Sequence, residues 1–229
     1  MGYERRQRRL MANILCIETA TTNCSVALSV NGGVIALNED NSKSYSHAEW
    51  LHVYISAVLK DAQLDKEQLD AIAVSMGPGS YTGLRIGVSA AKGLCFALDI
   101  PLIAIATLES LATRVEESSG VIVPMLDARR MEVYSAVFSS EKQQIRDTQA
   151  QILNEASYSE YLVNGQVTFI GNGVEKFEPL CNHPNASFRK EDLPSAAQMA
   201  PLAECKYKKN DTVDVAYFEP YYLKDFISG

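Results

Sequence analysis

Apolar residues in the first half of the chain fall into short runs separated by turn residues, and then into longer stretches with helical spacing. The first three runs are typical of strands, and the stretch 31–33 (Asn-Gly-Gly) predicts a tight turn between two of them. Ser46 and Glu49 stand in capping-box positions at the start of a helical stretch. The predicted order is βββ-α-β-α-β-α, with elements at 13–18, 24–30, 34–38, 46–62, 69–76, 80–98, 101–106 and 107–118.

The second half of the chain repeats this pattern less regularly, and its tail, 213–224, is predicted to be extended and aromatic. Two successive βββ-αβα units indicate an α/β fold with two lobes and a cleft between them. We expect one lobe at 12–107 and a smaller one, including the tail, at 108–229. The predicted elements are strands at 121–127, 131–138, 145–153 and 167–171, and helices at 155–163, from 173 and at 195–207.

A glycine-rich stretch from Gly77 to Gly87 (GPGSYTGLRIG) joins a predicted strand to a predicted helix. Glycine permits backbone angles that are closed to other residues, and Ser80 is placed to cap the helix. Such a turn can hold a phosphate at the helix N-terminus, or it can serve only to reverse the chain. The phosphate-binding pattern G-x-x-x-x-G-K-[ST] is absent, because Leu84 follows Gly83 where lysine is required.

Composition narrows the classes of protein that fit. The 229 residues are enough for one large domain or two small ones, and 47% are apolar. The net charge is −7, and residues 1–10 contain four arginines and one glutamate, which leaves −10 for residues 11–229. An acidic body repels phosphate backbones, so we do not expect strong binding of nucleic acid by this chain alone. No apolar run approaches the roughly 20 residues of a membrane span, and five widely spaced cysteines fit a reducing cytoplasm.

Residues that suggest chemistry are few. Glu18, Thr19 and Thr21 end the first strand, where they can face a phosphate or a magnesium ion, or simply cap the hairpin turn. His47 and His52 are five residues apart on a predicted helix, so they do not share a ligand face and we expect no metal site. The sequence places no serine or cysteine beside a histidine and an acid, so nucleophilic catalysis has no support.

Six stretches of the sequence carry a recognisable pattern, and together they span most of residues 12–224. They are ILCIETATTNCSVAL (14–28), HAEWL (47–51), GPGSYTGLRIG (77–87), PLIAIATLESL (101–111), MLDARR (125–130) and EPYYLK (219–224). These stretches resemble the TsaB family, and the glycine-rich one is the most specific of the six. That family provides the non-catalytic subunit of the bacterial machinery that makes N6-threonylcarbamoyladenosine in tRNA.

The resemblance implies the actin/Hsp70/sugar-kinase (ASKHA) fold, built from two βββαβα lobes. It implies a heterodimer with the related transferase TsaD, an ATPase, TsaE, that docks on this pair, and TsaC as the source of the threonylcarbamoyl adenylate. The chain itself would have no catalytic residues and no cofactor, since ATP and metal are expected on the partners. It would meet tRNA only through the complex, and it is expected to form a homodimer when isolated.

The resemblance also implies that helices 46–62 and 80–98 pack against TsaD, and both carry apolar or small residues on more than one face. In TsaD the corresponding helix binds metal through histidines four apart, whereas here Leu51 follows His47 at that spacing. The alternative is an enzyme of the same fold, either a degenerate metallopeptidase or a small-molecule kinase with the loop 171–173 at its nucleotide. The expected interface residues are Leu51, Tyr54, Ile55, Ser80, Tyr81, Leu84, Arg85 and Val88.

Overall fold

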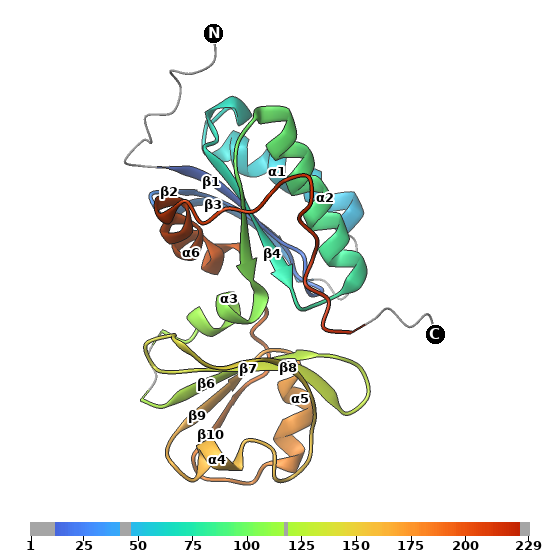
Figure 1. Cartoon of the computed structure of the whole chain (residues 1–229), viewed down its shortest axis with the longest axis vertical. Coiled ribbons are helices and arrows are strands. Elements are labelled where there is room, and N and C mark those ends of the chain that lie inside the picture. Colours follow the sequence, from blue (N-terminus) through green and yellow to red (C-terminus); the bar gives the residue numbers. More distant parts are fainter. Residues whose placement is uncertain (1–11, 42–46, 117–118, 225–229) are drawn as a thin grey trace.

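Two five-stranded mixed sheets, one in each lobe, organise the chain (Figure 1). The computed structural model describes residues 12–41, 47–116 and 119–224. The strands of the first sheet are β1 (Asn13–Glu18), β2 (Cys24–Val30), β3 (Gly33–Asp40), β4 (Ala71–Gly77) and β5 (Leu102–Ala106). Those of the second sheet are β6 (Val121–Asp127), β7 (Glu132–Phe138), β8 (Gln144–Ile152), β9 (Val167–Ile170) and β10 (Ala186–Arg189).

The two sheets have the same topology. Their strand orders are β3-β2-β1-β4-β5 and β10-β9-β6-β7-β8, so each strand of the first sheet has a counterpart in the second. In each sheet the first three strands form an antiparallel meander, and the next two add in parallel beside the first strand. The two-lobed fold predicted from the repeat is therefore confirmed, although the sequence did not predict β10.

Helices differ between the lobes in length and in number. Their bounds are α1 (His47–Asp61), α2 (Tyr81–Leu98), α3 (Thr107–Thr113), α4 (Ser159–Leu162), α5 (Val174–Phe177) and α6 (Ala196–Lys209), with short 3-10 turns at Lys66–Gln68 and Glu178–Leu180. None of the helices in the described part of the chain combines the length and the apolar character needed to cross a bilayer.

Helices cover both faces of the first sheet, because its central strands are apolar on both faces. On one face Leu15 and Ile17 of β1 belong to the core under α1 and α2. On the other face Ile14 and Cys16 of the same strand pack against α6, which contributes Met199 and three buried alanines. Strand β1 therefore alternates between two cores, as the period of two residues requires.

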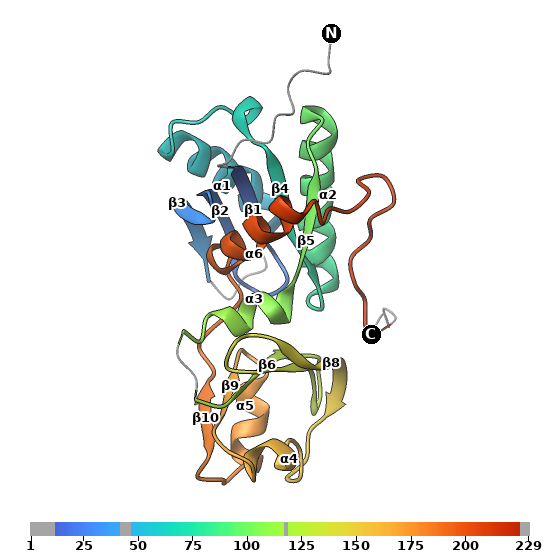
Figure 2. The same ribbon diagram turned by 60° about the vertical axis from the view of Figure 1, so that its left-hand side comes forward.

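The position of α6 corrects the predicted domain boundary. Its residues follow the second lobe in sequence, yet they pack on the first sheet, and Val213 in the tail beyond them pairs with Leu102 on β5 (Figure 2). The expected lobe at 108–229 is therefore wrong for α6 and the tail. Helix α3 lies between the lobes, where Leu108 and Leu111 pack with Ile122 of β6. The second lobe consists of β6 to β10 with α4 and α5.

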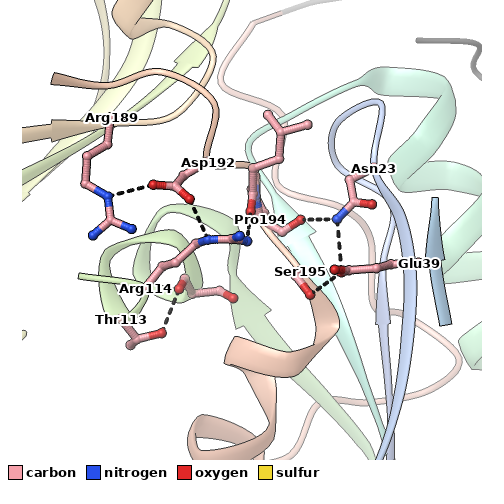
Figure 3. Close-up of polar contacts among 10 residues, drawn as sticks. Asn23, Glu39, Thr113, Arg114, Arg189, Asp192, Pro194 and Ser195 are labelled. Atoms are coloured by element: carbon pink, nitrogen blue, oxygen red, sulfur yellow. Dashed lines mark hydrogen bonds and ion pairs between the residues drawn. The ribbon is translucent and has the colours of Figure 1, made fainter. Parts of the chain in front are cut away.

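Polar contacts fix the crossover from the second lobe back to the first (Figure 3). Arg114, just after α3, forms an ion pair with Asp192, at 2.9 Å between Nε and Oδ1. Further along the crossover, Ser195 donates to a carboxylate oxygen of Glu39 on β3 at 2.6 Å. Asn23 donates to the same oxygen at 3.4 Å. The crossover is thus tied at one end to the junction between the lobes and at the other to the first sheet.

Candidate partner-binding surface

The glycine-rich stretch lets the turn between β1 and β2 pack directly against the start of α2. A Cβ atom on Gly83 would collide with the carbonyl oxygen of Thr19, and one on Gly79 would collide with Ala20. The Thr19 hydroxyl donates to the Gly83 carbonyl at 2.8 Å, and Ser80 caps the helix by accepting from the Gly83 N–H at 3.3 Å. These glycines therefore have a steric role in joining a hairpin to a helix.

Glu18 lies at the centre of this junction and is 0% exposed. Its Oε1 accepts hydrogen bonds from the backbone N–H of Ala20 at 2.6 Å and from the Ser75 hydroxyl at 2.8 Å. Burial away from water raises the pKa of this carboxyl to about 7, against the opposing effect of its hydrogen bonds. The carboxyl group thus links the ends of β1 and β4.

The predicted phosphate site at this turn involves three side chains that are all buried. Glu18 and Thr19 are 0% exposed and Thr21 is 4% exposed. The Thr21 hydroxyl accepts from the N–H of Asn23 at 3.3 Å, and its carbonyl lies 2.7 Å from Nε2 of His47. A phosphate would have to displace these internal contacts to reach the three side chains.

Four of the expected interface residues are part of the protein's own core. Leu51, Ile55, Leu84 and Val88 are between 0% and 5% exposed. Leu51, Ile55 and Val88 belong to the core on the first sheet, and the Leu84 side chain lies beside Gly77 at the end of β4. The prediction that these side chains contact a partner is wrong. Helical spacing identifies which residues share a face, but each of these helices has apolar or small residues on two faces, and spacing alone does not say which of the two is buried.

The other four expected interface residues lie at or near the surface. Tyr54 is half-buried and stacks on exposed Trp50, with ring centroids 6.1 Å apart. Ser80 and Tyr81 are half-buried at the N-terminal end of α2, and Arg85 is exposed. The structure brings Ser80, Tyr81 and Arg85 together on α2 and leaves Tyr54 on α1.

A groove of about 590 Å³ runs along the outward surface between α1 and α2. Its lining contains one arginine, Arg85, and one histidine, His52, and every other residue that lines it is small, hydroxylic or aliphatic. Phe96, near the C-terminal end of α2, is 86% exposed, and Val53 on α1 is 49% exposed. The lining residues are Ala48, His52, Arg85, Ile86, Ser89, Ala90, Gly93 and Leu94.

We call these lining residues, with Val53 and Phe96, the α1/α2 face. Of the residues of this face, Arg85 alone is among the expected interface residues. The helical period of α2 separates the other lining residues from the core. Leu84, Val88, Ala91 and Cys95 share one helical face and are all buried, so the groove residues of α2 lie on a different face.

The structure also shows where the two helical histidines and the loop 171–173 lie. His47 is buried against the first hairpin turn, whereas His52 lines the groove. Among the described residues, no group of three or more histidine, cysteine, aspartate or glutamate side chains is arranged to hold a metal ion. Gly171 and Gly173 pack against the backbone of Met125, and the Gly173 N–H donates to its carbonyl at 3.1 Å.

Two lobes with this repeated topology define the class of actin/Hsp70/sugar-kinase-like (ASKHA) folds. In line with this, the structure of YeaZ from Pseudomonas aeruginosa superposes with a TM-score of 0.82, at 27% sequence identity, over 93% of this chain and 100% of that one. Residues 32–225 match the family model of TsaD, tRNA N6-adenosine threonylcarbamoyltransferase.

Curated relatives narrow the class to a family. The tRNA threonylcarbamoyladenosine biosynthesis protein TsaB of Escherichia coli (strain K12) is 30% identical over 223 residues, which cover 94% of this chain and 96% of that protein. TsaB of Haemophilus influenzae is 29% identical over 226 residues, with 94% of each chain covered. The chain therefore belongs to the TsaB family and takes part in the biosynthesis of threonylcarbamoyladenosine in tRNA.

Proposed function

We propose that this chain is a non-catalytic scaffold subunit that binds the transferase TsaD through the α1/α2 face. The observation that carries the proposal is the character of that face, which combines a groove of small and aliphatic residues with exposed Val53 and Phe96. Small residues let another helix approach closely, and exposed aromatic side chains are favoured as anchors in interfaces.

The relationship to TsaD supports this choice of partner. Because the chain matches the TsaD family model over most of its length, the two proteins are expected to share the first lobe and its two long helices. Related folds can then pair through equivalent helices in a nearly two-fold arrangement. In the absence of TsaD, the same face would join two copies of this chain.

The proposal places the chemistry on the partners. TsaD would transfer the threonylcarbamoyl group, TsaE would dock on the pair, and ATP and metal would be bound by those proteins. This chain would stabilise the shape of TsaD in which tRNA is modified, and it would meet tRNA only within the complex. The acidic net charge of −7 fits a subunit that does not bind tRNA strongly by itself.

The experiment that tests this role is reconstitution of tRNA modification with TsaD, TsaE and TsaC, with and without this chain. We expect modification only in its presence, and no transferase activity from the chain alone. Full modification in its absence would exclude the scaffold role.

A pair of surface variants tests the α1/α2 face. Val53→Glu places a charge on an exposed position of this face, and we expect it to abolish co-purification with TsaD while leaving the circular dichroism spectrum unchanged, because Val53 is 49% exposed. The matched control is Val163→Glu, because Val163 is 71% exposed on the second lobe. Equal binding of TsaD by the two variants would exclude this face as the interface.

A further inference from the structure

The C-terminal tail lies along the side of α2 (Figure 2). Val213 donates its N–H to the carbonyl of Leu102 on the edge strand β5 at 2.9 Å. Lys92 of α2 donates to two tail carbonyls, those of Ala216 at 3.1 Å and Phe218 at 2.9 Å. The tail is therefore fastened to both the first sheet and α2 before it reaches its aromatic end.

The aromatic end of the tail contacts the N-terminal end of α2. The N–H of Tyr221 donates to the carbonyl of Met76, the residue before Gly77, at 2.7 Å. The ring of Tyr222 then lies 4.9 Å from the ring of Tyr81, measured between centroids. Beyond it, Lys224 forms an ion pair with Glu132 of the second lobe. The position of Tyr222 is thus fixed from both sides.

Tyr81 in turn holds Arg85. The guanidinium carbon of Arg85 lies 4.4 Å from the centroid of the Tyr81 ring, which is the geometry of a cation–π contact. The rings of Tyr222 and Tyr81 are tilted by 39° to each other, and with Arg85 they form a continuous row of contacts from the tail to the groove, which we call the tail stack. Arg85 is one of the residues that line the groove.

The charge of Arg85 has no acidic partner in the part of the chain that the structure describes. Helix α2 has 18 residues but only two charged side chains, Arg85 and Lys92, and Lys92 is occupied by the tail carbonyls. Arg85 also lies near the N-terminal end of α2, where the positive end of the helix dipole favours an approaching anion. This end of the groove therefore presents a cation that forms no ion pair with any described residue.

We propose that the tail stack is a recognition device of the partner-binding surface, in which Tyr222 and Tyr81 position Arg85 to receive a carboxylate side chain of TsaD. The inference rests on the proposed function and adds the chemistry of the contact. Apart from Arg85 and His52, the groove is lined by small, hydroxylic and aliphatic residues. An apolar helix of the partner with one aspartate or glutamate opposite Arg85 would be complementary to it.

The tail stack connects the tail to the groove by restricting the Arg85 side chain. An arginine side chain loses considerable freedom when it is fixed in an ion pair, and this loss offsets much of the gain at an exposed site. Stacking on Tyr81 restricts the guanidinium before the partner arrives, so less freedom is lost on binding. The planar fork of arginine can then bind both carboxylate oxygens, which lysine does not do.

The first test measures the affinity of full-length chains for TsaD by calorimetry at low and high salt. We expect Arg85→Ala and Arg85→Lys to weaken binding roughly tenfold, and Arg85→Glu to weaken it roughly a hundredfold or more. The salt dependence of binding should fall in Arg85→Ala, because the ion pair is gone. Arg85 is exposed, so these variants should keep the unfolding temperature of the wild type.

The second test asks whether the tail acts through Arg85. Tyr222→Ala should weaken binding several-fold and Tyr222→Phe should restore it, because the ring and not the hydroxyl makes the stack. Tyr217→Ala is the matched control, since Tyr217 is on the same tail and 85% exposed. The double variant Arg85→Ala with Tyr222→Ala should bind no more weakly than Arg85→Ala alone.

The outcomes separate the two proposals. If wild-type chain and TsaD fail to associate, the proposed function fails and the inference fails with it. If they associate and Arg85→Glu binds as tightly as the wild type, the inference alone is overturned. Additive effects of the Arg85 and Tyr222 changes would also overturn it, because the tail would then contact the partner independently.

Discussion

The two lobes have one topology but present different surfaces. The first lobe covers one face of its sheet with two long helices, α1 of 15 residues and α2 of 18 residues. The equivalent helices of the second lobe, α4 and α5, have four residues each. The second lobe instead fills its core with an aromatic cluster of Tyr158, Phe169, Phe177 and Phe188. Repeating a topology therefore does not repeat the surface that a lobe presents, because that surface depends on the helices.

The first hairpin turn of each lobe shows the same contrast. The turn after β1 is buried beneath α2, and Glu18 at its start is 0% exposed. The turn after β6 is exposed, and Asp127 at its start forms an ion pair with Lys176 at 2.9 Å. The difference arises from the glycines at the start of α2, which allow the helix to sit on the first turn.

The largest expected effect comes from one buried side chain in each lobe. Phe177→Ala in the second lobe should lower the free energy of unfolding by about 3–5 kcal/mol, and Leu84→Ala in α2 by about 2–5 kcal/mol, because each leaves a cavity. Both residues are 0% exposed. Denaturant titration measures the change. A loss below about 1 kcal/mol for Leu84→Ala would contradict its burial and make it a candidate partner contact again.

Burial of Glu18 in the first hairpin turn should make the stability of the protein depend on pH. Its pKa is about 7 in the folded chain and its ordinary value is 4.5, so the folded state binds the proton more tightly. The resulting stabilisation is fully present below about pH 4.5 and is lost as the pH rises through 7. Relative to Glu18→Gln, the wild type should lose up to about 3 kcal/mol between about pH 4.5 and about pH 8.

Denaturant titrations of both proteins across this pH range measure the difference. The equivalent substitution in the second lobe, Asp127→Asn, is the control and should change stability by less than about 1 kcal/mol, as expected for an exposed ion pair. A wild type that gains stability over Glu18→Gln as the pH rises would show that Glu18 is stabilised in its charged form.

The smallest expected changes in stability are those of alanine substitutions at two glycines of α2. Gly83→Ala should destabilise the protein by about 1–3 kcal/mol, because the added methyl group meets the backbone of Thr19. A methyl group on Gly93 would meet nothing within 4 Å, and Gly93→Ala should stabilise by about 0.5–1 kcal/mol through helix propensity. Thermal unfolding of both variants measures the opposite signs. Equal stabilisation would show that the hairpin turn does not rest on the helix.

Local patterns in the sequence determined most of the elements and the fold class. The spacing of apolar residues predicted the meander, the long helices α1 and α2, and the repeat that the second sheet follows. The glycine-rich stretch predicted a turn into a helix capped by Ser80, and Ser80 does cap α2. These features were predictable because strand period, helix period and capping depend on residues close together in the chain.

Contacts between distant residues decided the rest. Helix α6 joins the first sheet although it follows the second lobe, because its alanines and Met199 fit against Ile14 and Cys16, near the other end of the chain. Leu51 and Val88 turn inward, whereas Val53 and Phe96 turn outward, because only one of two apolar helix faces can meet the sheet. Tyr222 reaches Tyr81 through the path of the tail. Periodicity reveals that a face exists, but only packing determines what covers it.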